Sequence, residues 1–163
     1  MAVPFGGTIK MNWDELFIKQ ANLIAQKSKD KSTKVGCVIV GQDNAVLSMG
    51  FNGFPRGVEE SSAERWERPE KYEWVEHAER NAIFNAARHG IKLAGARAYL
   101  NWGGVPCSEC TRALIQAGIT EIIGPNIPFN GKGVGAGYNT KYSQTMLNEA
   151  GVALRTVNEI SEL

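Results

Sequence analysis

The sequence predicts an α/β protein, a three-layer α/β/α sandwich with a central five-stranded mixed sheet. Short β-branched runs alternate with segments of helical apolar spacing, and glycine and proline mark the boundaries between them. Neither a repeat nor a linker interrupts this series. Residues 1–163 are long enough to bury one core, so we expect them to form a single domain.

The first part of the chain is predicted to contain a helix and a hairpin. Apolar residues recur with helical spacing over 13–29, and Asn12 is a suitable N-cap for this helix. A charged loop follows. The β-branched run at 35–40 then predicts a buried strand, and the turn-forming residues after it make 46–52 its hairpin partner.

The middle of the chain is less regular. Glycine and proline predict a loop at 53–57, and the polar stretch 58–75 is expected to contain one helix interrupted near Pro69. A helix follows over 76–89, with a glycine placed to end it. Residues 96–102 are then the third strand.

The last part of the chain continues the alternation of helix and strand. The helix predicted over 107–118 begins after a proline and ends at a glycine, and the strand 121–124 follows it. The glycine-rich stretch 129–139 lacks the spacing of a P-loop, which favours a flexible loop over a lid or a phosphate contact. A helix over 140–151 and a strand over 152–157 complete the predicted fold.

Composition and charge restrict the class of function. With 18 basic and 17 acidic side chains, the net charge of +1 argues against a protein that binds a long nucleic acid, whereas a small anionic ligand still fits. The sequence shows neither a secretory signal nor an apolar run as long as the roughly 18 residues of a membrane span. We therefore expect a cytoplasmic protein that binds no membrane, and whose three cysteines are reduced thiols or metal ligands.

Two cysteines and a histidine form a candidate metal site. Cys107 and Cys110 lie at i and i+3 in the first turn of a predicted helix, where the unsatisfied N–H groups favour thiolates on one face. His77, at the start of another predicted helix, is a possible third ligand. Such a set leaves the fourth tetrahedral position of a Zn²⁺ ion open, as in a catalytic site. A redox pair of cysteines is the alternative.

Glu79 is the candidate catalytic residue. It stands two positions after His77, so the two side chains share a task only at a helix end, where both project into one pocket. A carboxylate that does not ligate zinc, but lies beside the zinc-bound water, serves as a proton shuttle. The pattern H-x-E … P-C-x-x-C is also that of zinc-dependent nucleobase deaminases.

Several motifs together resemble the deoxycytidylate (dCMP) deaminases of the cytidine deaminase superfamily. These motifs are HAERNAI, PCSECTRALIQAGI, KSKDKSTKVGCVIV and GFNGFPRG. The likeness extends from about Lys27 to Val152. It implies a cytidine deaminase-like fold with one catalytic Zn²⁺ per chain.

The resemblance also implies a reaction, the hydrolytic deamination of dCMP to dUMP and ammonia. Zinc-activated water attacks C4 of cytosine, while Glu79 transfers its proton to N3 and then to the leaving ammonia. Asn52 is expected to bind the sugar, although a simple turn residue is the alternative, and the backbone at Ala78 to bind the pyrimidine. For the phosphate, the resemblance suggests the loop with Ser28, Lys29 and Ser32, whose default role is a solvated loop.

Regulation and assembly are further expectations from the resemblance. The family is commonly a homo-oligomer, a hexamer above all, that dCTP activates and dTTP inhibits. The effector site is expected near the Asn-Gly-x-Pro loop, at Phe51, Gly53 and Arg56. Two departures affect these expectations: Phe51 stands where the family usually has Tyr, and Gly103–Gly104 lengthens the segment before Cys107 by about two residues.

The remaining notable residues have simpler interpretations. Cys37 lies in an apolar strand and is expected in the core, and His89 is expected to cap the end of a helix. Trp66 and Trp74 are expected to serve packing rather than base stacking, with an interface role open.

Two other functions compete with dCMP deamination. One is a related deaminase that acts on a tRNA adenosine, a free nucleoside or dCTP; the near-zero net charge argues against tRNA. The other is a non-catalytic zinc-binding regulatory module, which would have no use for Glu79.

Overall fold

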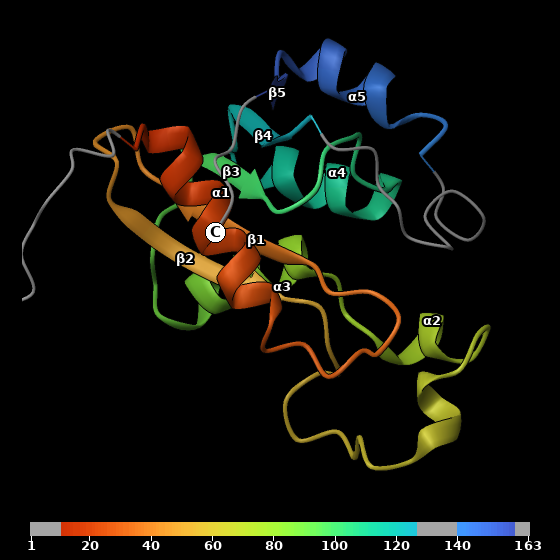
Figure 1. Cartoon of the computed structure of the whole chain (residues 1–163). Coiled ribbons are helices and arrows are strands. Elements are labelled where there is room, and N and C mark those ends of the chain that lie inside the picture. The colour runs from red at the N-terminus through yellow and green to blue at the C-terminus, as the bar shows by residue number, and fades with distance from the viewer. Residues whose placement is uncertain (1–10, 127–139, 159–163) are drawn as a thin grey trace, which may run out of the picture.

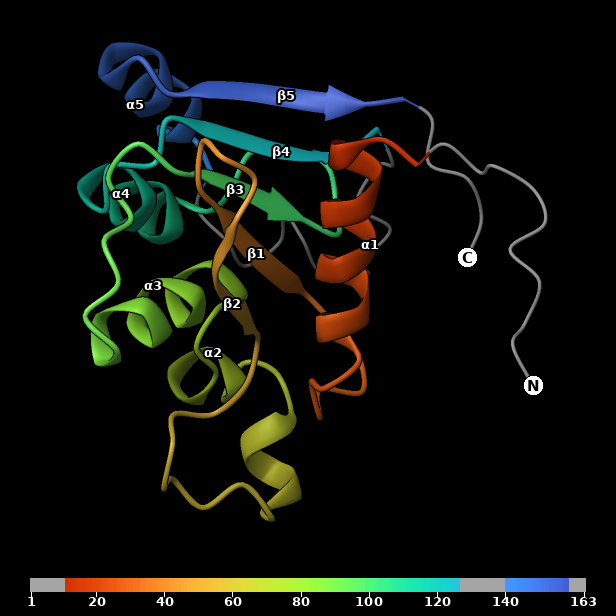
Figure 2. The ribbon, with the colours of Figure 1, turned by 90° about the vertical axis from the view of Figure 1, so that its left-hand side faces the viewer.

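The computed structural model describes residues 11–126 and 140–158 (Figures 1 and 2). Within these ranges, five strands form one mixed sheet in the order β2-β1-β3-β4-β5. The strands are β1 (Gly36–Val40), β2 (Val46–Phe51), β3 (Arg97–Leu100), β4 (Glu121–Pro125) and β5 (Ala153–Val157). The helices are α1 (Trp13–Ala25), α2 (Lys71–Trp74), α3 (Ala78–Arg88), α4 (Ser108–Gln116) and α5 (Ser143–Ala150), with a 3₁₀ turn at Ala63–Trp66. The predicted fold class is confirmed.

The direction of each strand follows from the connection that precedes it. β1 pairs antiparallel with β2 through a tight hairpin turn, and it also pairs antiparallel with β3. β3, β4 and β5 run parallel to one another, which requires a crossover between consecutive strands. Helix α4 lies in the first crossover and α5 in the second.

Helices cover both faces of the sheet, as Figure 2 shows, with α1 on one face and α3 and α4 on the other. Side chains of β1 alternate between these faces: Val38 and Val40 pack against α1, while Cys37 and Ile39 join the core beneath α3 and α4. All four are fully buried, so the expected core position of Cys37 is confirmed.

Some element boundaries differ from those predicted. Helix α1 ends at Ala25 rather than at residue 29, because Lys27 and Ser28 donate their backbone N–H groups to carbonyls only three residues back and the chain turns. The Asn12 cap is confirmed, since its side chain accepts a hydrogen bond of 2.8 Å from the backbone of Glu15. The polar stretch 58–75 contains a 3₁₀ turn and α2 on either side of Pro69 rather than one interrupted helix.

Two further predictions concern the ends of the described ranges. The glycine-rich stretch 129–139 lies outside the described residues, and the helix expected from residue 140 begins at Ser143. None of the helices in the described part of the chain has the length and apolar character that crossing a bilayer requires. His89 is the C-cap of α3, where the sequence indicated it.

The fold brings two helix N-termini together on one face of the sheet. His77 is the N-cap of α3 and Cys107 is the N-cap of α4, and both have extended backbone angles that direct the chain into the helix. Since α3 and α4 are neighbours on this face, their first turns converge near the sheet (Figure 2). This convergence forms the site described next.

Candidate active site

Three side chains meet where α3 and α4 begin. Nδ1 of His77 lies 3.3 Å from Sγ of Cys110 and 3.4 Å from Sγ of Cys107. The ligating atoms of the three residues all lie within 4.8 Å of one another. The structure thus brings together the three side chains that the sequence indicated as metal ligands.

This cluster fits a zinc ion in both spacing and chemistry. Nitrogen and sulfur ligands of a tetrahedral zinc ion lie roughly 3.6 Å apart, close to the spacing found here. Hydrogen bonds from Cys110 and from His77 lower the pKa of Cys107 to about 4, which makes it the thiolate that ligates metal. The same hydrogen bond and burial raise the pKa of the Cys110 thiol. A bound zinc ion would displace the Cys110 proton as well, and one imidazole and two thiolates would then leave one tetrahedral position for water.

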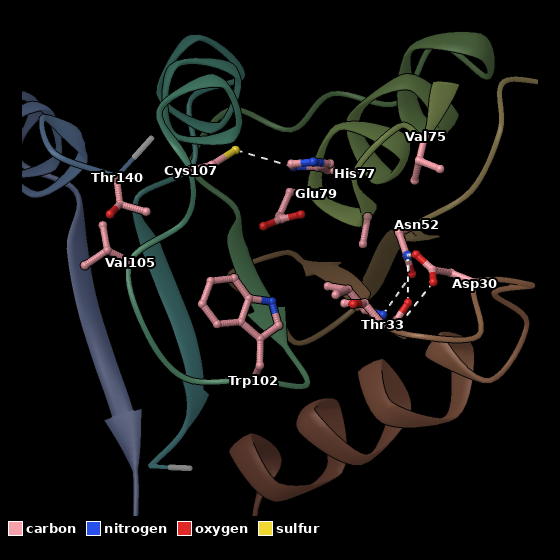
Figure 3. Close-up of a pocket in the computed structure, with 12 residues that line it drawn as sticks. Asp30, Thr33, Asn52, Val75, His77, Glu79, Trp102, Val105, Cys107 and Thr140 are labelled. Atoms are coloured by element: carbon pink, nitrogen blue, oxygen red, sulfur yellow. Dashed lines mark hydrogen bonds between the residues drawn. The ribbon is translucent and has the colours of Figure 1, made fainter. Parts of the chain in front are cut away.

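Glu79 lies beside this cluster without belonging to it. Its side chain is buried, with 3% of the residue exposed, and Figure 3 shows its carboxylate facing the pocket next to His77. Burial raises the pKa of Glu79, although the positive charge that His77 can carry opposes the shift. For His77, burial disfavours protonation, but the hydrogen bond to Cys107 and the charge of Glu79 outweigh it and raise the pKa. The raised pKa of Glu79 suits a carboxyl that takes up and releases protons during a reaction.

The pocket in front of the cluster has two unlike walls (Figure 3). One wall is polar and consists of Asp30, Thr33 and Asn52. The facing wall contains the indole of Trp102 and the side chain of Val105. The other lining residues are Val35, Val75, His77, Ala78, Glu79, Cys107 and Thr140. A flat ring with a polar edge suits this combination of an aromatic wall, a polar wall and a buried acid.

A comparison with protein families decides what this arrangement is. The family profile for the cytidine and deoxycytidylate deaminase zinc-binding region matches residues 11–124. The chain belongs to this deaminase family. The match spans the cluster, Glu79 and most of the pocket wall.

Individual relatives of the deaminase family agree with this assignment. The chain is 38% identical over 119 residues to the deoxycytidylate deaminase of Homo sapiens, an alignment that covers 69% of this chain and 64% of the relative. It is 38% identical over 142 residues to the "uncharacterized deaminase in luxG 3'region" of Aliivibrio fischeri, covering 86% of this chain and 90% of that one.

A solved structure gives the same result for the fold. The dCMP deaminase of the cyanophage S-TIM5, crystallised in complex with dCMP and dUMP, aligns with a TM-score of 0.68 at 25% identity. This alignment covers 88% of the present chain and 95% of the phage enzyme. The chain spans 59% to 64% of the length of the animal proteins it matches, the probable deoxycytidylate deaminase of Drosophila melanogaster and the deoxycytidylate deaminases of Mus musculus and Homo sapiens.

Two of the residues that the sequence predicted to bind substrate, Ala78 and Asn52, line this pocket. Ala78, fully buried, begins α3 directly between His77 and Glu79. The side chain of Asn52 is engaged on the polar wall: its Oδ1 accepts from the backbone of Val35 at 2.9 Å, and its Nδ2 donates to the carbonyl of Thr33 at 2.9 Å. Asn52 therefore shapes the wall as well as facing the substrate space.

The structure does not bring Ser28, Lys29 and Ser32 to the wall of this pocket. Ser28 is buried behind it and donates its hydroxyl to the carbonyl of Asn52 at 2.8 Å. Lys29 pairs with Glu60 at the surface. Lys29 and Ser32 line a neighbouring polar depression instead.

The three candidate effector residues also lie outside the pocket. The carbonyl of Phe51 accepts a hydrogen bond of 2.8 Å from the side chain of Asn81 on α3. Gly53 forms an isolated β-bridge with Glu76, directly before His77. Arg56 donates to the side chain of Asn85, also on α3.

The inserted glycines set the position of Trp102. A Cβ atom on Gly124 of β4 would come within 2.2 Å of the Trp102 carbonyl oxygen and 3.2 Å of the Gly103 Cα, so the insertion lies directly on β4. Gly104 has a φ of 134°, a backbone conformation that favours glycine. Trp102 and Val105, the residues on either side of Gly103–Gly104, line the pocket, whereas the two glycines do not.

Sequence reasoning missed Asp30, Thr33 and Trp102 as pocket residues. For Trp102, the available signal was an aromatic residue just before an insertion that adjoins a metal ligand. Trp66 and Trp74, which sequence reasoning did consider, stack on Phe54 with ring centroids 4.5 Å and 6.1 Å apart. Neither of them lines the metal-site pocket, so the expected packing role fits their contacts.

Proposed function

We propose that this chain catalyses the hydrolytic deamination of dCMP to dUMP and ammonia. The single observation that carries the proposal is the position of Glu79, buried beside three zinc-type ligands and facing the pocket without joining them. A structural zinc site is closed by four protein ligands and has no role for such a carboxyl. The arrangement therefore favours an enzyme over a regulatory zinc module.

The choice of dCMP as substrate is supported by relatives rather than by the pocket alone. Deoxycytidylate deaminases account for several of the similar sequences, and the phage structure of matching fold binds dCMP and dUMP. Because these relatives are longer or share only 25% identity, the substrate assignment is our inference for this chain.

The chemistry assigned to the metal site is water activation. His77, Cys107 and Cys110 would hold the zinc ion, whose Lewis acidity makes a water molecule nucleophilic near neutral pH. Hydrolysis would form a bond from a water oxygen to C4 of cytosine and break the bond from C4 to the exocyclic nitrogen.

Glu79 moves the two protons that this exchange requires. Its carboxylate accepts a proton from the water and delivers it to N3 of the ring. It then accepts the second proton from the oxygen now attached to C4 and delivers it to the departing amino group, which leaves as ammonia. Burial increases the proton affinity of the Glu79 carboxylate, because desolvation raises its pKa.

The remaining contacts follow from the two walls. We assign the pyrimidine to the backbone at Ala78 and to the face of Trp102, and the sugar to the polar wall at Asn52. No lysine or arginine occurs among the described lining residues. For the phosphate we retain Ser28, Lys29 and Ser32 as candidates, with Lys29 favoured because its side chain is 68% exposed.

Regulation and assembly are part of the same proposal. The chain is proposed to form a homo-oligomer, with a hexamer favoured. We propose that dCTP activates this oligomer and that dTTP inhibits it. Phe51, Gly53 and Arg56 support a link between effector and active site, because all three contact α3 or the residue before His77.

The test is ammonia release by the zinc-loaded protein from dCMP, CMP, deoxycytidine and dCTP. We expect turnover of dCMP, and we expect the Glu79→Gln variant to lose several orders of magnitude in kcat while it retains zinc. Titration of dCTP and dTTP into the dCMP assay, with sedimentation of the same sample, tests regulation and assembly. A zinc-loaded protein that releases no ammonia from any cytosine compound would contradict the proposal.

A further inference from the structure

Lys71 is a buried cation outside the metal site, with only 2% of the residue exposed. Lysines are almost never buried to this degree unless they are paired. We propose that Lys71 is a positioning residue for the deaminase reaction: it holds the polar wall of the pocket in place through Asp30. This inference rests on the proposed function, because its main readout is the binding of a cytosine nucleotide.

The ammonium group of Lys71 contacts the wall directly. Its Nζ lies 2.7 Å from Oδ2 of Asp30 and 2.8 Å from the hydroxyl of Ser32. The side chains of the pair are only 2% and 3% exposed, so solvent does not screen the interaction. The two residues are 41 positions apart, so the contact joins α2 to the loop after α1.

Asp30 also accepts hydrogen bonds from the loop that follows it, and these bonds hold the loop in one conformation. Its other oxygen, Oδ1, accepts hydrogen bonds from the backbone of Ser32 at 2.8 Å, from the Ser32 hydroxyl at 2.9 Å and from the backbone of Thr33 at 3.2 Å. Burial opposes ionisation of Asp30, but the hydrogen bonds from Lys71 and Ser32 outweigh it and keep its pKa below the ordinary value. Lys71 thus keeps Asp30 an anion that can organise the turn.

Asn52 links this turn to the pocket, because it hydrogen-bonds the turn and also lines the pocket. Its Nδ2 reaches both Oδ2 of Asp30 at 3.4 Å and the carbonyl of Thr33 at 2.9 Å. Asp30, Thr33 and Asn52 all line the pocket, whereas Lys71 does not. Figure 3 shows the side chains of Asp30 and Asn52 joined by hydrogen bonds to the backbone of Thr33, across the pocket from Trp102. Lys71 therefore acts on the substrate only through the residues it holds.

The backbone of Lys71 connects the same wall to the metal site. Its carbonyl accepts the N–H of Val75, another lining residue, at 2.9 Å. Two residues on, His77 belongs to the cluster of candidate metal ligands, and Glu76 between them bonds to Gly53 through both backbone groups at 2.9 Å and 3.0 Å. One short helix thus fixes both the polar wall and the approach to a metal ligand.

A buried ion pair adds little net stability to a fold, because a pair of well-packed apolar residues in its place often stabilises the fold equally. What the pair does supply is one defined arrangement of Asp30 and the turn. The test therefore needs a readout that a loss of stability alone would not move, which is a rise in KM at nearly constant kcat.

The variants follow from the pair. Lys71→Met alone leaves a buried unpaired carboxylate, so the main variant combines Lys71→Met with Asp30→Asn and removes both charges. We expect it to retain one zinc per chain, with KM for dCMP raised about tenfold and kcat within about threefold of the wild type. If this variant does not fold, Asp30→Asn alone, which is isosteric, is expected to show the same direction of change.

The matched control is Asp14→Asn, which breaks an ion pair with Arg155 at β5. Asp14 lies on α1, on the opposite face of the sheet from α3, and does not line the pocket. We expect this variant to melt at a lower temperature while its KM stays within twofold of the wild type. Equal KM values for the wild type and the charge-free variant would overturn the proposal.

A second measurement does not depend on the substrate. The backbone amides of Ser32, Thr33 and Val35 should exchange with deuterium at least about tenfold faster in the charge-free variant, while that of Ile39 in β1 keeps its rate. If the wild-type protein turns over no cytosine compound, the proposed function fails and this exchange decides the role of Lys71. Unchanged exchange at the three amides would then overturn it.

Discussion

Gly50 of β2 and Ala78 of α3 are in contact through their backbones. A Cβ atom at position 50 would come within 2.6 Å of the Ala78 carbonyl oxygen, and within 2.4 Å of the Ala82 backbone nitrogen. Only glycine allows so close an approach. Because Ala78 stands between His77 and Glu79, the contact sets where the proposed metal ligand and the proposed proton carrier lie relative to the sheet.

The first prediction concerns this contact. Gly50→Ala should push the first turn of α3 away from β2 and cost about 1–3 kcal/mol of folding free energy, since overpacking cannot relax against backbone. It should also weaken zinc binding. Thermal melting and zinc content measure both effects. Gly53→Ala is the control, because a Cβ there meets only the Phe51 ring at 3.7 Å; equal losses in the two variants would show that the contact with α3 is not special.

A second prediction separates the candidate ligand cysteines from Cys37, which lies in the core outside the ligand cluster. Cys110→Ser should lower zinc affinity by more than about 100-fold, the upper end of the range seen when only a supporting residue is lost. Cys37→Ala should keep one zinc per chain, because Cys37 lies in the core and outside the ligand cluster. A chelator competition with a colorimetric indicator measures both. Loss of zinc from the Cys37 variant alone would refute the assigned ligand set.

A third prediction concerns the aromatic wall. Trp102→Ala should raise KM for dCMP by about tenfold or more, since stacking of a base on an aromatic side chain contributes about 1–3 kcal/mol. Trp102→Phe should recover most of that loss. Trp13→Ala is the matched control, because Trp13 is 56% exposed on α1. Steady-state kinetics decide it: similar KM values for the two alanine variants would exclude Trp102 from substrate binding.

The fourth prediction is a dependence of stability on pH. The hydrogen bond from Arg155, followed by that from Tyr99, lowers the pKa of Asp14 against the opposing effect of burial. A carboxyl with a lowered folded-state pKa stabilises the fold above its unfolded pKa of about 4, and this contribution is lost as the pH falls through the folded pKa.

The measurement is urea unfolding of the wild type and of Asp14→Asn between pH 7 and pH 3. At pH 7 we expect the variant to be less stable by about 2 kcal/mol, the range of hydrogen bonds to charged groups. The difference should shrink as the pH falls below about 4. A difference that grows toward acid pH would contradict the assigned direction of the Asp14 pKa.

The features that could be predicted from sequence are those that depend on residues close together in the chain. The β-branched run of β1, the Asn12 cap and the glycine after α3 each act within a few residues, so periodicity and capping rules found them. The C-terminal end of α1 and the segment before α2 were misjudged, because side-chain contacts with distant loops, rather than helix propensity, determine where those segments turn.

The sequence by itself determined the residue types of the metal site: a histidine and an acid two positions apart at one helix start, and two cysteines at another. Tertiary structure decided what surrounds them. The loop that carries Trp102 and Gly103 packs against Gly124 of β4, and Lys71 reaches Asp30 across 41 residues of chain. Residue spacing along the chain reveals strands and helices through their periods of two and 3.6 residues. It does not reveal these contacts, because they depend on how the sheet brings separate loops to one edge.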